Sequence, residues 1–145
     1  LMRDGIDKFM LLYRVKEDFV RDACSKLGAH YLANGRPTAV IYLASSVNIA
    51  LTESIAALRA QEPGYSYSSM GDLLERIAAE PSLARYAKEA GVYRDMILLG
   101  EALALAGSRE SARGIWTALI AARAPAPWDA EARAALARPA GAAGL

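Results

Sequence analysis

The sequence holds a single cysteine, Cys24, and a single histidine, His30. One cysteine cannot form an intrachain disulfide, and the two residues together are too few to build a zinc site of the Cys or His type. No second thiol or neighbouring histidine activates Cys24, so a small apolar residue on a helix face is a simpler interpretation than a reactive thiol. Neither a metal ion nor a cofactor is expected.

The sequence also lacks an excess of basic or acidic residues. Seventeen Lys and Arg residues face sixteen Asp and Glu residues, which leaves a net charge of +1. A chain this close to neutral has no overall electrostatic attraction to nucleic acid, to an anionic membrane or to an acidic substrate. Nucleic acid is therefore not the expected partner.

Catalytic and targeting signatures are absent from the sequence as well. There is no Gly-rich phosphate loop, no nucleophile motif and no carboxylate pair in a setting that would shift its pKa, so a non-catalytic protein is expected. The most apolar run, 39–51, contains Ser45, Ser46 and Asn48 and is shorter than the roughly twenty residues that span a bilayer. It predicts a buried helix and no transmembrane segment. No signal peptide is expected either, and the compartment stays open.

Ala and Leu supply most of the apolar content, which is 54% of the chain. This bias favours helices over the β-branched and aromatic residues that are typical of strands. A length of 145 residues is that of one ordinary domain. We therefore predict an all-α fold of antiparallel helix pairs in one domain over 1–137, and a disordered tail over the Ala-, Gly- and Pro-rich residues 138–145.

Apolar spacing and turn residues divide the chain into helices. Apolar residues recur at helical spacing from Ile6 to Ala33, which predicts one long helix or two in line. Asn34-Gly35 ends this segment, and Pro37 begins a central helix that runs to about Ala60. Ser69, with Asp72 three residues later, approximates a capping box, and Ser108 is expected to cap a later helix. The predicted pairs cover about 6–60, 69–90 and 92–123, with single helices at 69–79, 83–90, 92–106 and 108–123 and a last one at 127–137.

A short segment occurs twice in the sequence. Residues 27–36 (LGAHYLANGR) align with residues 99–108 (LGEALALAGS), and in each copy a second Gly follows the first by seven residues. A Gly inside a helix costs roughly 1 kcal/mol relative to Ala, so it indicates a close contact between helices, and the second Gly makes a turn. The residues that carry the comparison are Leu27, Gly28, Tyr31 and Gly35 in the early copy, and Leu99, Gly100 and Gly107 in the late one.

The late copy resembles a tetratricopeptide repeat over residues 93–125. The residues that match the family are Leu99, Gly100, the turn Gly107, Ala112, Trp116 and a closing proline. In that family the Leu-Gly pair belongs to the first helix of a pair, the small Ala to the crossing point of the second, and the aromatic to the core. Met96, Leu103 and Leu119 depart from the family pattern. The resemblance implies a short α-solenoid of about three helix pairs, with a degenerate pair at 69–90 between the two copies. An ordinary helical bundle with two similar turns is the alternative.

The resemblance also implies a protein–protein interaction module, scaffold or adaptor. In the family, the first helices of each pair line a concave surface that receives a peptide or a partner helix. The positions that match this groove-facing pattern are Asp22, Ser25, Ala29, Leu32 and Ala33 in the early copy, and Arg94, Ile97, Glu101, Ala104 and Leu105 in the late one. One Arg is too few for the carboxylate-binding variety of the family. An amphipathic helix of another protein or a second copy of this chain is the expected partner.

Residues 87–97 support a different hypothesis, because they resemble the helix-turn-helix of bacterial repressors through Ala87, Gly91, Val92 and Ile97. In such a protein the second helix enters the major groove and needs a polar, exposed start. Only three residues supply that start, Tyr93, Arg94 and Asp95. DNA binding is therefore the alternative function.

Two pairs of residues leave their roles open. Asn48 and Glu53 lie in the apolar helix that follows Pro37, where they line either a small polar pocket or, as we expect, a solvent-facing stripe. Tyr65 and Tyr67, in the Ser-rich loop, either contact a partner or attach the loop to the core.

Overall fold

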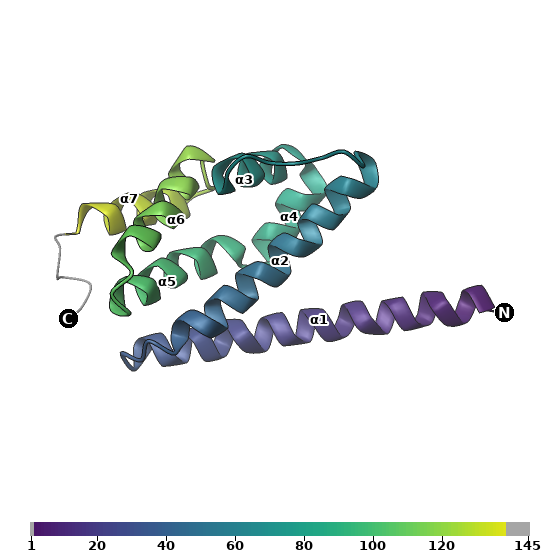
Figure 1. Ribbon diagram of the computed structural model, residues 1–145, viewed down its shortest axis with the longest axis horizontal. Coiled ribbons are helices and arrows are strands. Elements are labelled where there is room, and N and C mark those ends of the chain that lie inside the picture. Colours follow the sequence, from purple (N-terminus) through teal and green to yellow (C-terminus); the bar gives the residue numbers. More distant parts are fainter. Residues whose placement is uncertain (1, 139–145) are drawn as a thin grey trace.

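The chain folds into helices without any strand over the residues that its computed structural model describes, which are 2–138 for the backbone and 17–138 for the side chains. The all-α prediction is confirmed. Seven helices pack together (Figure 1) in the order α1 (Met2–Ala33), α2 (Ala39–Gln61), α3 (Met70–Ala79), α4 (Pro81–Ala90), α5 (Val92–Leu105), α6 (Arg109–Ala121) and α7 (Trp128–Ala137).

Several helix ends differ from the prediction. α2 begins at Ala39 rather than at Pro37, which lies in the preceding turn. α4 begins at Pro81, two residues earlier than predicted, because the fixed φ of proline suits the first turn of a helix. The cap of α3 is confirmed, since the Ser69 hydroxyl accepts the backbone N–H of Asp72 at 3.1 Å. Ser108 is the N-cap residue of α6, as predicted, but its side chain forms no cap hydrogen bond.

The predicted tail is described only at Arg138. Its carbonyl accepts a hydrogen bond from Arg109 at 2.9 Å, and its guanidinium lies 3.5 Å from Glu101. Arg138 therefore belongs to the folded part of the chain, whereas the rest of the predicted disordered segment, 139–145, lies outside the described residues.

The hairpins α1–α2 and α5–α6 turn in the same way. Gly35 and Gly107 both have a positive φ, 67° and 90°, which is a conformation that glycine adopts without strain. In each turn the Gly N–H and the next N–H bond back to carbonyls in the last turn of the preceding helix, the pattern of a Schellman motif. The bonds are Gly35 to Leu32 and Arg36 to Tyr31 in one hairpin, and Gly107 to Ala104 and Ser108 to Leu103 in the other.

The same two hairpins are closed by a glycine in the first helix. A Cβ atom on Gly28 would lie 2.5 Å from Cγ of Leu43, and a Cβ atom on Gly100 would lie 2.5 Å from Cε2 of Trp116. The close contacts predicted from the two Leu-Gly pairs are thus present in both hairpins. Leu43 of α2 thus contacts the mid-helix glycine of its hairpin, as Trp116 of α6 does in the other hairpin. A fully buried alanine precedes each of these large residues by four positions, Ala39 in one hairpin and Ala112 in the other.

The α3–α4 pair does not lie between the two hairpins. α5 packs directly on α2, α6 packs on α5, and α7 packs on α6 and α5. The loop 62–69 leads from the far end of α2 back to α3, which packs on α6, while α4 packs on α3 and α5 (Figure 1). The predicted placement of residues 69–90 as the middle pair of a stack is therefore wrong, because the long loop carries them to one side.

α2 is central, as predicted, and contacts α1, α4 and α5. It continues past Leu51 to Gln61, so its 23 residues are long and apolar enough to cross a membrane by length and composition, with 39% of its most apolar window buried in the fold. Its buried face includes Leu43, Val47, Leu51 and Leu58. α2 thus supplies a large part of the core while it also meets the length requirement of a membrane span.

Candidate functional site

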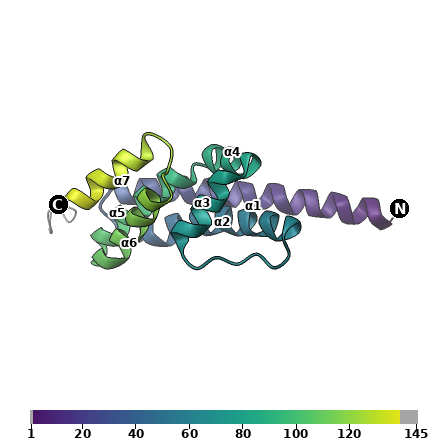
Figure 2. The ribbon, with the colours of Figure 1, turned by 90° about the horizontal axis from the view of Figure 1, so that it is seen from above.

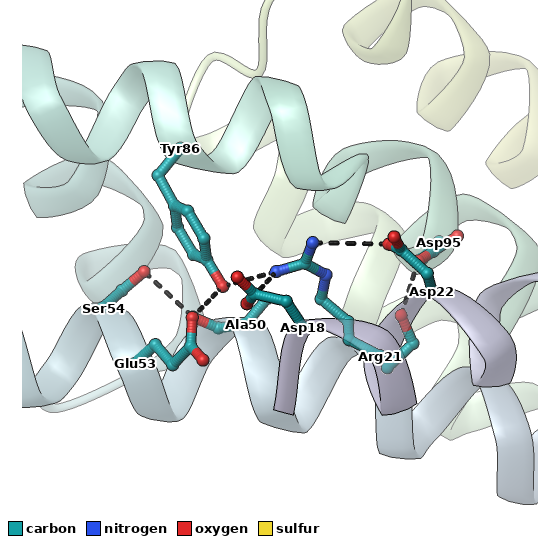
Figure 3. Close-up of polar contacts among 9 residues, drawn as sticks. Asp18, Arg21, Asp22, Ala50, Glu53, Ser54, Tyr86 and Asp95 are labelled. Atoms are coloured by element: carbon teal, nitrogen blue, oxygen red, sulfur yellow. Dashed lines mark hydrogen bonds and ion pairs between the residues drawn. The ribbon is translucent and has the colours of Figure 1, made fainter. Parts of the chain in front are cut away.

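Arg21 joins α1 to α4 in a cluster of polar side chains (Figure 3). Its side chain is largely buried, and Nη1 donates a hydrogen bond to the hydroxyl of Tyr86 at 2.8 Å. The guanidinium carbon also lies 5.5 Å from the centre of the Tyr86 ring, within the range of a cation–π interaction. Asp18 and Asp22, both on α1, accept hydrogen bonds from the same guanidinium at 3.1 and 3.3 Å. The contact between Arg21 and Tyr86 therefore joins α1 to α4.

Tyr86 extends this contact to α2, because its hydroxyl donates to Glu53. Burial, together with the hydrogen bond to Glu53, raises the pKa of Tyr86 well above its usual value. The predicted solvent-facing stripe is right for Asn48, which is exposed, and wrong for Glu53. Five residues along a helix rotate a side chain to a different side, so the two positions need not share a face.

Asp95 of α5 forms a second polar contact with α1 and α2. The residue is 1% exposed, and its two carboxylate oxygens accept hydrogen bonds from Ser25 and Ser46, each at 2.8 Å. Burial raises the pKa of Asp95, and the two serine hydrogen bonds oppose that rise. This role of Asp95 was not predicted from the sequence, although the residue lies one turn from Val92 and Leu99 and so falls on an apolar helix face.

The polar cluster fixes α1 in place. Its hydroxyls and carboxylates bond to one another, and they come from α1, α2, α4 and α5 (Figure 3). Among residues 17–138 no group of three or more His, Cys, Asp or Glu side chains is placed to hold a metal ion. Most of the buried polar groups thus satisfy each other, as in a structural network, whereas Nε of Arg21 is buried without a hydrogen-bond partner among the described residues.

The exposed side of α1 carries three large apolar residues. Phe19 is 74% exposed, Leu27 is 41% exposed and Val20 is 39% exposed. The described part of α1, from residue 17 on, contributes no fully buried apolar side chain to the core, and only Tyr31 and Leu32 pack against it with partial burial. α1 therefore directs Arg21 and Ser25 inward, whereas its exposed side carries these large apolar residues together with Asp22, Lys26 and His30. We refer to Phe19, Val20 and Leu27 as the outer stripe of α1.

The predicted groove residues lie on two helices that do meet, since Ser25 of α1 bonds to Asp95 of α5. Asp22, Ala33 and Arg94 are exposed, whereas Ala29, Leu32, Glu101, Ala104 and Leu105 are half-buried. Ile97 is 3% exposed and belongs to the core, so its predicted contact with a partner is wrong. The Ser25 hydroxyl donates its hydrogen to Asp95, so it cannot donate to a partner.

The helix-turn-helix hypothesis needs an exposed polar start of α5, and most of that start is buried. Gly91 does form a left-handed turn between α4 and α5, with φ of 70°. However, Tyr93 and Asp95 are buried, at 4% and 1% exposure, which leaves Arg94 as the exposed residue of the predicted polar start. A helix that reads DNA needs its first turn free to reach the bases.

The loop before α3 attaches to the core through Tyr65. This residue is half-buried, and its carbonyl accepts a hydrogen bond from Arg59 at 3.2 Å. Tyr67 is 43% exposed, with its ring centre 6.3 Å from that of Tyr65. Of the two roles left open, Tyr65 attaches the loop, and Tyr67 remains available on the surface, where the two tyrosines border a depression of about 520 Å³.

Arg21→Ala is expected to loosen α1 without unfolding the other helices. It removes the hydrogen bond to Tyr86 and the cation–π contact, and hydrogen bonds to charged groups contribute about 1.5–3 kcal/mol. Amide hydrogen exchange over residues 18–30 should accelerate by about tenfold or more, with α5 and α6 unchanged. Arg85→Ala, at an exposed position of α4, is the matched control and should leave exchange as in the parent protein. Unchanged exchange in α1, or an equal acceleration throughout, would contradict the assigned role of Arg21.

Comparisons with known protein families, with characterised proteins and with solved structures find no match to this chain.

Proposed function

We propose that this chain is a non-catalytic protein–protein interaction module, a scaffold or adaptor that binds a helix of a partner protein along α1. The observation that carries this proposal is the orientation of α1, with Arg21 and Ser25 inward and its outer stripe in water. Burying apolar surface stabilises a structure by about 25 cal/mol per Å². The outer stripe places three large apolar side chains on one helix, and a bound partner would bury them. Single exposed apolar side chains would need no such explanation.

The arrangement of the hairpins supports a short stack of tetratricopeptide-like helix pairs. α1–α2 and α5–α6 share the turn glycine, the mid-helix glycine and the buried alanine. α5 packs on α2 as α7 packs on α6, so the order of contacts repeats along the chain. In this interpretation α3–α4 is an insertion, and α1 and α5 are the first helices that line the interaction surface.

The partner that fits this surface is an amphipathic helix. Val20 and Leu27 are seven residues apart and lie on one side of α1, the spacing with which helices present apolar anchors to each other. The exposed charges on α1 and α5 near the predicted groove are of both signs, with Asp22 on one helix and Arg94 on the other. A strongly acidic or strongly basic ligand is therefore not favoured.

A photo-reactive amino acid at position 27 tests this proposal. In an extract of the source cells, a benzophenone side chain in place of Leu27 is expected to crosslink to one discrete protein species, either another protein or a second copy of the chain. The same side chain in place of Thr52, at an exposed position of α2, is the control and should give no discrete product. Absence of any product at position 27, or equal products at both positions, would refute the assignment.

A further inference from the structure

We infer that α1 opens as one unit, away from the other helices and about the turn 34–38, while α2 to α7 stay folded. The hydrogen-bonded side chains of Arg21, Tyr86 and Glu53, which we call the α1 latch, hold the helix closed. This device goes beyond the proposed function and does not depend on it, since a helix can open whether or not a partner binds to it.

The described part of α1 buries few of its residues against the fold. Of residues 17–33, Arg21 and Gly28 are the buried ones, and glycine has no side chain. By contrast, α5 buries eight of its 14 residues, Met96 and Ile97 among them. Because the burial of apolar surface is the dominant favourable contribution to folding, α1 is held to the fold less firmly than α5 is.

The latch joins α1 to two other helices by hydrogen bonds (Figure 3). Arg21 of α1 donates to the hydroxyl of Tyr86 on α4, and that hydroxyl donates to Glu53 on α2. Nε of the same guanidinium is buried with no hydrogen-bond partner among residues 17–138. A buried donor that is left unpaired costs free energy. Water can pair this donor once α1 opens, so opening recovers part of that cost.

Each group of the latch keeps a partner when α1 opens. Asp18 and Asp22 lie on α1 with Arg21, so their hydrogen bonds to the guanidinium move with the helix. On the other side of the contact, Tyr86 still donates to Glu53, since both belong to helices that stay in place. Within the latch, opening breaks the hydrogen bond between Arg21 and Tyr86 together with their cation–π contact.

The second polar contact of α1 is arranged in the same way. Ser25 of α1 donates to one carboxylate oxygen of Asp95, while Ser46 of α2 donates to the other. When α1 leaves, Asp95 keeps the hydrogen bond from Ser46, and water replaces Ser25. A helix held by groups that stay partnered on both sides can leave at a lower cost than one whose departure leaves a buried charge unpaired.

The turn between α1 and α2 supplies the hinge. Residues 34–38 are exposed, and Gly35 has a φ of 67°. α1 lies at the edge of the fold in Figure 1, and both views of the ribbon show its first half extending past the other helices (Figures 1 and 2). The helix can therefore move outward without displacing another one, with the change in backbone angles confined to a few loop residues, as in other hinges.

Opening uncovers a core leucine of α2. Leu43 is 0% exposed, and its side chain lies against Gly28 of α1. In the open state this side chain meets water. Leu119 of α6 is also 0% exposed but belongs to the helices that stay folded. The latch therefore sets how often this apolar surface of α2 is reachable from solvent.

Labelling of a buried thiol under native conditions tests the opening. In a Cys24→Ser background, Leu43→Cys places a thiol beneath α1, and Leu119→Cys is the matched control in the core of the other helices. An aromatic disulfide reagent should label position 43 at least about tenfold faster than position 119, because local opening costs less free energy than global unfolding. Equal labelling rates at the two positions would overturn the inference.

Arg21→Ala and Tyr86→Phe test the latch in the same assay. Arg21→Ala should accelerate labelling at position 43 by about tenfold or more, the effect expected for a lost hydrogen bond to a charged group, and leave position 119 unchanged. Tyr86→Phe should have a smaller effect in the same direction, because its ring keeps the cation–π contact. Arg85→Ala is the control and should change neither rate. The latch is refuted if both variants leave position 43 unchanged or accelerate the two positions equally.

Amide hydrogen exchange on the unmodified chain measures opening without a core substitution. Once α1 separates, it loses the packing on which a helix normally depends for its stability. Amides 22–33 should therefore exchange with one common protection factor, at least about tenfold lower than that of α5. Equal protection in α1 and α5 would contradict the opening even where a cysteine variant failed to fold. Crosslinking at position 27 tests the proposed function separately from all of these outcomes.

Discussion

Gly100→Ala is expected to lower the free energy of unfolding by about 1–3 kcal/mol, the usual cost of forcing extra atoms into a well-packed core. The added Cβ would overlap the Trp116 ring, which is 2% exposed and donates a hydrogen bond to the carbonyl of Ile97 at 3.3 Å. Either the ring or the backbone of α5 must therefore shift. Urea denaturation followed by circular dichroism measures the change.

Gly114→Ala is the matched control for this prediction. Gly114 lies inside α6, and a Cβ atom there would meet nothing within 4 Å. Since Ala favours a helix over Gly by roughly 1 kcal/mol, this variant should be more stable than the parent protein. Gly28→Ala should fall between the two, because the side chain of Leu43 can adjust more easily than an indole. If Gly100→Ala stabilised the protein as Gly114→Ala does, the close α5–α6 contact would be refuted.

Asp95→Ala is expected to cost about 1–3 kcal/mol, because it leaves the Ser46 hydroxyl, which is 1% exposed, without an acceptor. Asp95→Asn keeps an acceptor for one serine and removes the buried charge, so it should cost less. The free energies of unfolding of both variants at pH 7 measure the difference. Equal losses in the two variants would contradict the assigned hydrogen bonds.

The Asp95→Asn variant should also change the dependence of stability on pH. Burial raises the folded-state pKa of Asp95 above 3.8, so the folded protein binds the proton more tightly than the unfolded chain does. The contribution of this carboxyl is therefore most favourable below pH 3.8 and declines as pH rises through the folded pKa. Asparagine does not titrate in this range. The free energy of unfolding of Asp95→Asn, relative to that of the parent protein, should therefore rise between pH 3 and pH 7. A constant difference over that range would contradict the raised pKa.

Local features of the fold were predictable because they depend on neighbours in the sequence. Gly35 and Gly107 end helices through their own backbone conformation, and Gly28 and Gly100 signal close contacts because glycine is otherwise unfavourable within a helix. Their sequence spacing was enough to identify both hairpins. The position of α3–α4 was not predictable, because it depends on the path of a loop and on contacts with α6, which is distant in sequence.

The polar cluster could not be predicted for the same reason. Arg21 and Tyr86 are 65 residues apart, and Ser25 and Asp95 are 70 apart, so no local pattern links them. The orientation of α1 was missed because helical spacing identifies a set of apolar positions but does not tell which side of the helix meets the core. Ile97 was assigned to a groove from the family pattern, whereas the packing of α5 against α2 and α6 buries it.

The most direct test of this account is the free energy of unfolding of the double variant Phe19→Gln, Leu27→Gln. If both side chains face water, the double variant should match the parent protein within about 0.5 kcal/mol, as surface substitutions do. Leu43→Ala, in the fully buried contact with Gly28, should lose about 2–5 kcal/mol in the same assay. A loss in the double variant as large as that of Leu43→Ala would show that the outer stripe of α1 is part of the core, and would contradict its role as a binding surface.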